Sequence, residues 1–355
     1  MDKSSGSTRK QSSQNRNITD FISELLVPTS KIIAPVRQQA VKIFHNLGIL
    51  PFLLIVLILG VTALQPRFFS LTNLFNVSRQ FTYLVIVTVA QMIPLVCRGL
   101  DLSVGANIGF TSILTASTML ALSSIIGEPL TVALAMMIGV AVGTVVGAIN
   151  GLLIALFSIS PFIVTLGMMG IAFNLALTIS GGQQIFGLPD VFNTIFGVGT
   201  FLWLPVPLYF TIGVLILVYL VLSWTRLGRS FYALGGNPEA ARVSGIKTRL
   251  CTFYAYTLCG CLTGLTGVLL TARVNSGMAI LGTTLPLQSI AAAVLGGVSI
   301  FGGQGSVFGA FFGAVFIILL RNGMDLLGVG SYIQGIATGS VLILAVILDR
   351  YRHVV

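Results

Sequence analysis

Long apolar runs, separated by short polar or glycine-rich breaks, fill most of this chain of 355 residues. A helix needs about 20 apolar residues to cross the hydrocarbon core of a bilayer. The runs predict ten membrane-spanning helices, over about residues 48–64, 81–97, 104–122, 131–157, 161–180, 207–224, 251–272, 286–300, 306–320 and 332–348. We therefore expect an all-α polytopic membrane protein with broken helices around a central pathway.

The pattern divides the chain into a tail and a membrane domain. Residues 1–47 are polar and basic, which predicts a cytoplasmic N-terminal tail and no secretory signal peptide. Within it, residues 20–45 mix apolar and polar positions, so they fit either an interfacial helix or a solvated linker. Residues 48–350 form the predicted transmembrane domain, and residues 225–250 form a polar loop within it.

The basic residues set the expected orientation. The formal net charge is +10, and 14 of the 19 basic residues lie in three places. They are Lys3, Arg9, Lys10, Arg16, Lys31, Arg37 and Lys42; Arg226, Arg229, Arg242, Lys247 and Arg249; and Arg350 and Arg352. Cytoplasmic loops of membrane proteins are enriched in Lys and Arg. We expect both termini and the 225–250 loop in the cytoplasm, which ten crossings also require, and no binding to nucleic acid.

Composition and missing motifs argue against a soluble protein and against an enzyme. Only 8% of the residues are charged and 55% are hydrophobic, far from the balance of soluble domains. The cysteines and histidines show no metal-ligand spacing and no disulfide framework; they are Cys97, Cys251, Cys259, Cys261, His45 and His353. The chain has no Gly–Lys dipeptide, hence no Walker-type phosphate loop. We expect no catalytic residue and no metal site.

Glycines recur every four residues in three of the runs. The stripes are Gly139, Gly143, Gly147 and Gly151; Gly260 and Gly264; and Gly305, Gly309 and Gly313. Small residues on one stripe let helix backbones approach closely in lipid. Close helix packing explains each stripe, and stripes in both halves also suggest an internal repeat.

Three breaks interrupt the apolar runs, at residues 99–105, 158–161 and 296–305. Irregular backbone at membrane depth survives only where protein or a water-filled cavity satisfies it, so the breaks indicate a central pathway. Asp101 is the most informative residue, because a carboxylate in the bilayer needs a partner, for which Arg98 is the candidate. Alternatively, Arg98 and Asp101 are ordinary boundary charges at the cytoplasmic interface, or Asp101 and Ser103 cap the next helix. The candidate pathway residues are Asp101, Ser103, Asn150 and Thr165.

A short helix is predicted in the 225–250 loop. Asn237 is a good N-cap, Pro238 suits the first helical position, and Glu239 favours the positive helix start. Gly245 can end the helix in a left-handed conformation. Because two turns are marginal alone, this is either a helix that docks on a partner or a simple surface connection.

The motifs of this chain occur in a characteristic order. They are Gly-Leu-Asp-Leu-Ser-Val-Gly at 99–105, Pro-Phe-Ile-Val-Thr-Leu-Gly at 161–167, Leu-Gly-Arg at 227–229, Ala-Leu-Gly-Gly-Asn-Pro-Glu-Ala-Ala-Arg at 233–242, Ala-Val-Leu-Gly-Gly at 293–297, Gly-Gly-Gln-Gly-Ser at 302–306 and Asn-Gly-Met-Asp-Leu-Leu-Gly-Val at 322–329. Over about residues 48–350 the chain resembles the permease subunit of bacterial ATP-binding-cassette (ABC) importers for monosaccharides, the ribose-type family, of which autoinducer-2 permeases are close relatives.

The resemblance implies a passive subunit of a larger importer in the bacterial inner membrane. Its partners would be a cytoplasmic ABC ATPase that binds ATP and magnesium, a periplasmic sugar-binding protein, and a second copy or a homologous permease. The permease itself would hold no cofactor. By resemblance, the ATPase-coupling residues are Gly235, Gly236, Asn237, Glu239, Ala240, Ala241 and Arg242.

The chain departs from the pattern at one place. Many sugar permeases of this type carry Gly-Tyr-Glu-Leu-Asp before the Ile-Ala-Ala of the eighth span, whereas residues 284–288 read Thr-Leu-Pro-Leu-Gln. Transport of autoinducer-2 or another small polyol is therefore the alternative to a monosaccharide. An ion-coupled secondary transporter is less expected, because it needs membrane-embedded acids or histidines and Asp101 is nearly alone.

Overall fold

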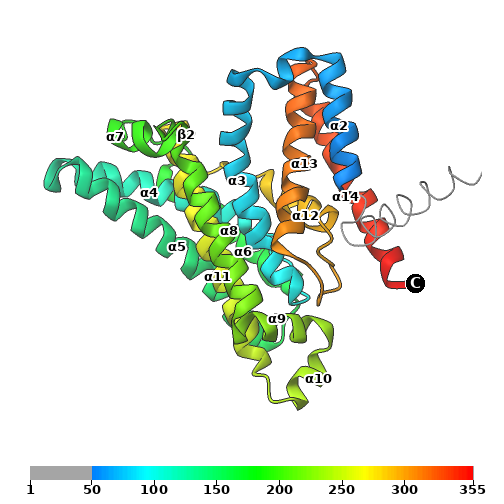
Figure 1. Cartoon of the computed structure of the whole chain (residues 1–355). Helices are drawn as coiled ribbons and strands as arrows, with labels where there is room; N and C mark the ends of the chain where they lie inside the picture. The colour runs from blue at the N-terminus through cyan, green and yellow to red at the C-terminus, as the bar shows by residue number, and fades with distance from the viewer. Residues whose placement is uncertain (1–49, 355) are drawn as a thin grey trace, which may run out of the picture. The chain divides into compact units, whose positions relative to one another are not determined.

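Helices account for almost all the regular structure of the protein. A computed structural model describes residues 50–354 and contains 13 α-helices in that range (Figure 1). The predicted tail at residues 1–47, with its candidate interfacial helix at 20–45, lies outside the described residues.

The apolar runs of the sequence are helices. Seven are long and apolar enough to cross a membrane: α3 (Leu71–Val96), α4 (Val104–Ile126), α5 (Glu128–Phe157), α6 (Pro161–Ser180), α8 (Val206–Trp224), α11 (Thr248–Val274) and α13 (Val307–Leu326). Three others are apolar over a shorter stretch: α2 (Leu50–Leu64), α12 (Leu285–Leu295) and α14 (Ser331–Val354). The 11 residues of α12 rise only about 16 Å. Ten full crossings are therefore not confirmed. Each predicted run contains a helix, but the run at 286–300 is helical only as far as Leu295.

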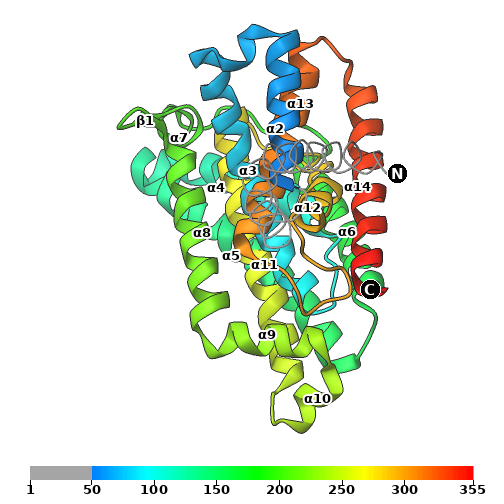
Figure 2. The same cartoon turned by 45° about the vertical axis from the view of Figure 1, so that its right-hand side comes forward.

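The remaining elements lie at two opposite ends of the long helices. At one end are α7 (Asp190–Phe192), the π-helical turn η2 (Asn193–Gly197) and a hairpin of β1 (Thr200–Phe201) with β2 (Leu204–Pro205). A 3-10 turn, η1 (Pro66–Phe69), connects α2 to α3. At the other end are α9 (Arg226–Gly236) and α10 (Pro238–Val243), and α8 runs between the two ends (Figure 2).

Two helices form the centre of the fold. In α3 every residue from Thr82 to Val96 is buried, which is what a helix that is apolar on all sides requires. Helix α11 packs against α3, α4 and α5. The buried core around them includes Ile86, Met92, Ile108 and Leu269. The exposed apolar side chains lie mainly on α5, α6, α8 and α14, as expected of surfaces that contact lipid.

Glycines place α5 directly against α11. A Cβ atom at Gly143 would lie 2.5 Å from the Cα atom of Gly264, and one at Gly147 would lie 2.7 Å from the Cα atom of Gly260. A Cβ atom at Gly151 would lie 2.9 Å from the Cα atom of Phe253. The two predicted stripes thus face each other, and dispersion between closely spaced backbones holds the pair together.

The third stripe is only partly helical. Gly309 packs against the Gly296 carbonyl and Gly313 against the Ala292 carbonyl, which brings α13 close to α12. Gly305, by contrast, precedes the Ser306 N-cap of α13 and has φ +149°, a conformation that L side chains rarely adopt. The expectation that Gly305 belongs to this helical stripe is therefore wrong.

A non-helical segment, residues 275–284, follows α11 and runs along α4. The Met278 N–H donates to Ser112 Oγ over 3.1 Å, and Gly277 pairs with Ile185 in an isolated β-bridge. Gly105 and Gly109 of α4 leave room for the backbone of this segment. Neighbouring protein thus bonds the backbone of this segment at Gly277 and Met278, as irregular backbone between membrane helices requires.

The α5–α11 contact leads to a stability prediction. We expect Gly147→Ala to lower the stability of the detergent-solubilised protein by about 1–3 kcal/mol, because the new methyl group forces the backbones apart. Gly213→Ala on α8 is the matched control, since nothing lies within 4 Å of its added Cβ atom, and alanine is the better helix former. Thermal unfolding measures both variants, and equal melting temperatures would contradict close packing at Gly147.

Candidate functional site

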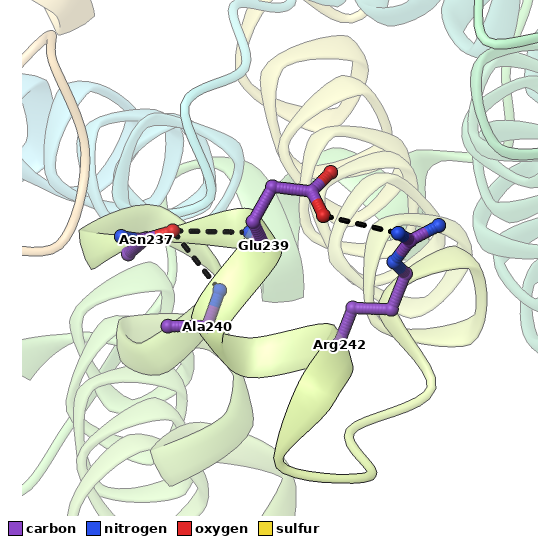
Figure 3. Close-up of polar contacts among 4 residues, drawn as sticks. All are labelled: Asn237, Glu239, Ala240 and Arg242. Carbon is purple, nitrogen blue, oxygen red and sulfur yellow. Dashed lines mark hydrogen bonds and ion pairs between the residues drawn. The ribbon is translucent and has the colours of Figure 1, made fainter.

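The short helix α10 has the caps that its sequence predicts. Asn237 Oδ1 accepts hydrogen bonds from the backbone N–H groups of Glu239 (3.1 Å) and Ala240 (3.0 Å) (Figure 3). Pro238 occupies the first turn, and Gly245 beyond the helix has φ +83°. The helix is therefore ordered by its own caps and does not depend on propensity alone.

The surface of α10 is both apolar and charged. The side chain of Val243 is 86% exposed. Arg242 Nη2 and Glu239 Oε2 form an ion pair of 3.1 Å, in which both side chains are exposed (Figure 3). Such a pair contributes only about 0–1 kcal/mol to stability. The protruding helix therefore presents an exposed valine, which is not among the candidate coupling residues, beside an exposed charged pair.

Helix α9 is joined directly to α10 and fixed to the rest of the chain. Asn237 ends α9 through its N–H bond to the Ala233 carbonyl and also begins α10. Tyr232 Oη donates to the Gly305 carbonyl over 2.9 Å. Burial, followed by the electrostatic effect of Cys97, raises the pKa of the Tyr232 hydroxyl, so it stays a neutral donor near pH 7.

Arg98 contacts the end of α9, next to the junction with α10. Its Nε donates to the Gly235 carbonyl over 2.7 Å, and its Nη2 donates to the Gly236 carbonyl over 2.8 Å. These are the last carbonyls of α9, where a cation is favoured. The predicted pairing of Arg98 with Asp101 is therefore wrong. Arg98 has φ +62°, which turns its side chain toward α9, and no ion pair joins the two residues in the described part of the chain.

Asp101 is buried in the bend between α3 and α4. Its side chain is 2% exposed, and its Oδ1 accepts from the Ser103 N–H (2.9 Å) and Ser103 Oγ (2.6 Å). Asn150 Nδ2 of α5 donates to Ser103 Oγ over 2.9 Å. The structure thus brings three of the four candidate pathway residues into one hydrogen-bonded cluster. The bond to the N–H two residues ahead is an Asx turn, so Asp101 fixes the turn immediately before α4, whose N-cap residue is Ser103.

The fourth candidate, Thr165 of α6, bonds to the same bend. Its Oγ1 donates to the Pro161 carbonyl over 2.8 Å and lies 3.3 Å from the Leu100 carbonyl. Tyr256 Oη of α11 also lies 3.3 Å from the Leu100 carbonyl. Because all four candidates are buried, they do not line an open passage in a single copy of the chain, and the pathway assignment stays a prediction.

A further polar layer lies between α4, α5 and α11. Asn107 Nδ2 donates to Thr263 Oγ1 (2.9 Å) and to the Gly143 carbonyl (3.2 Å). Thr271 Oγ1 donates to Ser112 Oγ over 2.7 Å. In a bundle of membrane helices such bonds join neighbours at about 1 kcal/mol each. Asn107 and Ser112 follow the Asp101 cluster along α4. The central helices are therefore joined by hydrogen bonds as well as by glycine contacts.

Fold and site together define a class of protein: a helical, multi-span membrane protein with a capped helix pair protruding at one end. The chain belongs to the branched-chain amino acid transport system permease component family, whose model matches residues 73–348. No solved structure matches the chain significantly.

Curated relatives cover most of the chain. The ribose import permease protein RbsC of Escherichia coli (strain K12) is 37% identical over 304 residues, which is 84% of this chain and 92% of the relative. RbsC of Bacillus subtilis (strain 168) is 37% identical over 87% of this chain and 94% of its own. The D-allose transport system permease protein AlsC of E. coli K12 is 34% identical over 84% and 90%.

The Asp101 cluster can be tested by two substitutions. Asp101→Asn keeps an oxygen acceptor for Ser103, whereas Asp101→Leu leaves buried donors unsatisfied. We therefore expect the leucine variant to be less stable than the asparagine variant by about 1–3 kcal/mol, measured by thermal unfolding in detergent. If both variants lost stability equally, the negative charge itself would be required, and the role of Asp101 as a hydrogen-bond acceptor for the turn would be wrong.

Proposed function

We propose that this chain is the membrane-spanning permease subunit of an ABC importer that carries a ribose-type monosaccharide across the bacterial inner membrane. The observation that carries the proposal is the similarity to ribose import permeases over more than four-fifths of the chain. The galactose/methyl galactoside permease MglC of Haemophilus influenzae, 33% identical over 85% of this chain, also supports a monosaccharide substrate.

The energy for transport comes from a separate ATPase subunit in this proposal. The sequence has no Walker-type loop of its own, so ATP and magnesium are bound by that partner. The docking element is α10, because it is capped by Asn237, exposed at Ala240 and Val243, and joined to α9 without a flexible linker. An ordered helix can pass a movement of the ATPase on to α9, whereas a flexible loop would absorb it.

The other partners and the orientation complete the proposal. A periplasmic sugar-binding protein delivers the substrate to the end that carries α7 and the β1–β2 hairpin. A second copy or a homologous permease completes the pathway, as the resemblance to importer permeases implies. The α9–α10 end and both termini face the cytoplasm, in agreement with the excess of basic residues in those segments.

Docking of the ATPase on α10 can be measured by co-purification. We expect Ala240→Trp to reduce recovery of the ATPase with the permease by at least about tenfold, which corresponds to about 1.4 kcal/mol of binding free energy. Ala121→Trp is the matched control. Ala121 is also exposed, but it lies in the C-terminal part of α4 and not on α10. Unchanged recovery with Ala240→Trp, at equal membrane insertion, would contradict docking at α10.

The orientation has an independent test. Val243→Cys places a thiol on an 86% exposed position. A maleimide reagent that cannot cross membranes should label this thiol in inverted inner-membrane vesicles and not in intact spheroplasts, after subtraction of the labelling of the parent chain. Labelling in spheroplasts alone would place α10 outside the cytoplasm and refute the proposed arrangement.

A further inference from the structure

Arg98 occupies a joint where three parts of the chain meet. We use "the α9 joint" for Arg98, Gly235, Gly236, Gly302 and Gly303. The guanidinium of Arg98 holds the carbonyls of Gly235 and Gly236 at 2.7 and 2.8 Å. The Gly303 N–H donates to the carbonyl of Val96, at the end of α3, over 2.9 Å. The ends of α3 and α9 and the loop before α13 are thereby bonded at one point.

The α9 joint is packed so closely that its parts cannot slide past one another. A Cβ atom at Gly235 would collide with the Val96 carbonyl and the Gly303 backbone. One at Gly302 would collide with the side chain of Arg98. Gly302 and Gly303 have φ +86° and +75°, and Arg98 itself has φ +62°. A non-glycine residue in this conformation is uncommon, and it persists only where surrounding contacts fix it.

The bend that begins at Arg98 also holds four membrane helices. Two residues further on, the Leu100 carbonyl lies 3.3 Å from Thr165 Oγ1 of α6 and 3.3 Å from Tyr256 Oη of α11. Asp101 and Ser103 then link the start of α4 to Asn150 of α5. A displacement of α9 that is passed to Arg98 therefore reaches α4, α5, α6 and α11 through a bend of only six residues, 98–103.

We propose that Arg98 is a positioning residue that transmits movement of the α9–α10 pair to the 98–103 bend and so to the transport helices. The inference rests on the proposed function. An arginine suits this role because its planar guanidinium carries several donors in a fixed fork, so it grips two successive carbonyls at once. These two hydrogen bonds keep the bend attached to the end of α9, so the bend follows when α9 is displaced.

The test compares coupling in assembled complexes. The chain and variants are purified with the ATPase and the sugar-binding protein, reconstituted in vesicles, and measured for ATPase recovery, basal ATP hydrolysis, stimulation by the sugar-loaded binding protein, and sugar uptake per ATP. We expect Arg98→Gln to retain ATPase recovery and basal hydrolysis but to lose stimulation and uptake. Arg98→Lys, whose single ammonium group lacks the planar arrangement of donors of a guanidinium, should retain only part of the stimulation.

Arg226→Gln is the matched control, since Arg226 is an exposed arginine at the start of α9, away from the joint. It should behave as the parent chain. Full stimulation and normal uptake per ATP in Arg98→Gln would overturn the inference. If Arg98→Gln fails to fold, Arg98→Lys decides: full coupling in that variant overturns the inference, and a partial loss at normal ATPase recovery supports it. Failure of the parent chain to recover any ATPase would instead refute the proposed function.

Discussion

The requirement that non-helical backbone between membrane helices have all its polar groups bonded governs this structure. The bend between α3 and α4 has its bonded polar groups close together. The Leu100 carbonyl has hydroxyl groups from α6 and α11 within hydrogen-bonding distance. Asp101 accepts from the Ser103 N–H in the turn before α4, and Arg98 bonds to the end of α9. Because water is scarce at such a site, each unmade bond costs more than it does at a protein surface. The surrounding helices are consequently held in one arrangement by their bonds to the bend.

Glycine contacts provide the second level of organisation. Apolar side chains gain little by moving from lipid to protein, so membrane helices associate through close packing and hydrogen bonds. The pairs α5–α11 and α12–α13 both use glycines for this purpose, at Gly143 and Gly264 in the first and at Gly296 and Gly309 in the second. Such contacts fix the distance between two helices and resist insertion of any side chain.

The sequence predicts what depends on local or one-dimensional patterns. Hydropathy alone locates the helices, and α6 has the predicted bounds (161–180) because Pro161 starts it and Gly181 ends it. The caps of α10 are equally local. By contrast, α3 begins ten residues earlier than expected, since Ser70 caps it and its polar first turns bond to other elements, as Asn73 does to Asn322. The partner of Arg98 lies 137 residues away, and nothing in the local spacing to Asp101 could reveal it.

The buried carboxylates show how the interior of this chain is used. Asp101 accepts from Ser103 and holds the bend before α4, and Asp349 accepts from the Ile300 N–H (3.2 Å) and Ser299 Oγ (3.3 Å) and holds the loop before α13. Both acids therefore serve as acceptors that shape irregular backbone near the α9 joint. A carboxylate that carries ions through the membrane must exchange its partners in every cycle. Asp101 is instead held by a backbone N–H group of its own bend, and Asp349 of α14 is held by the Ile300 N–H of the loop before α13. The interior of the chain thus holds its helices together through these acceptors. The bend before α4 is bonded through Arg98 to the last carbonyls of α9, the helix that leads directly into the exposed and capped α10.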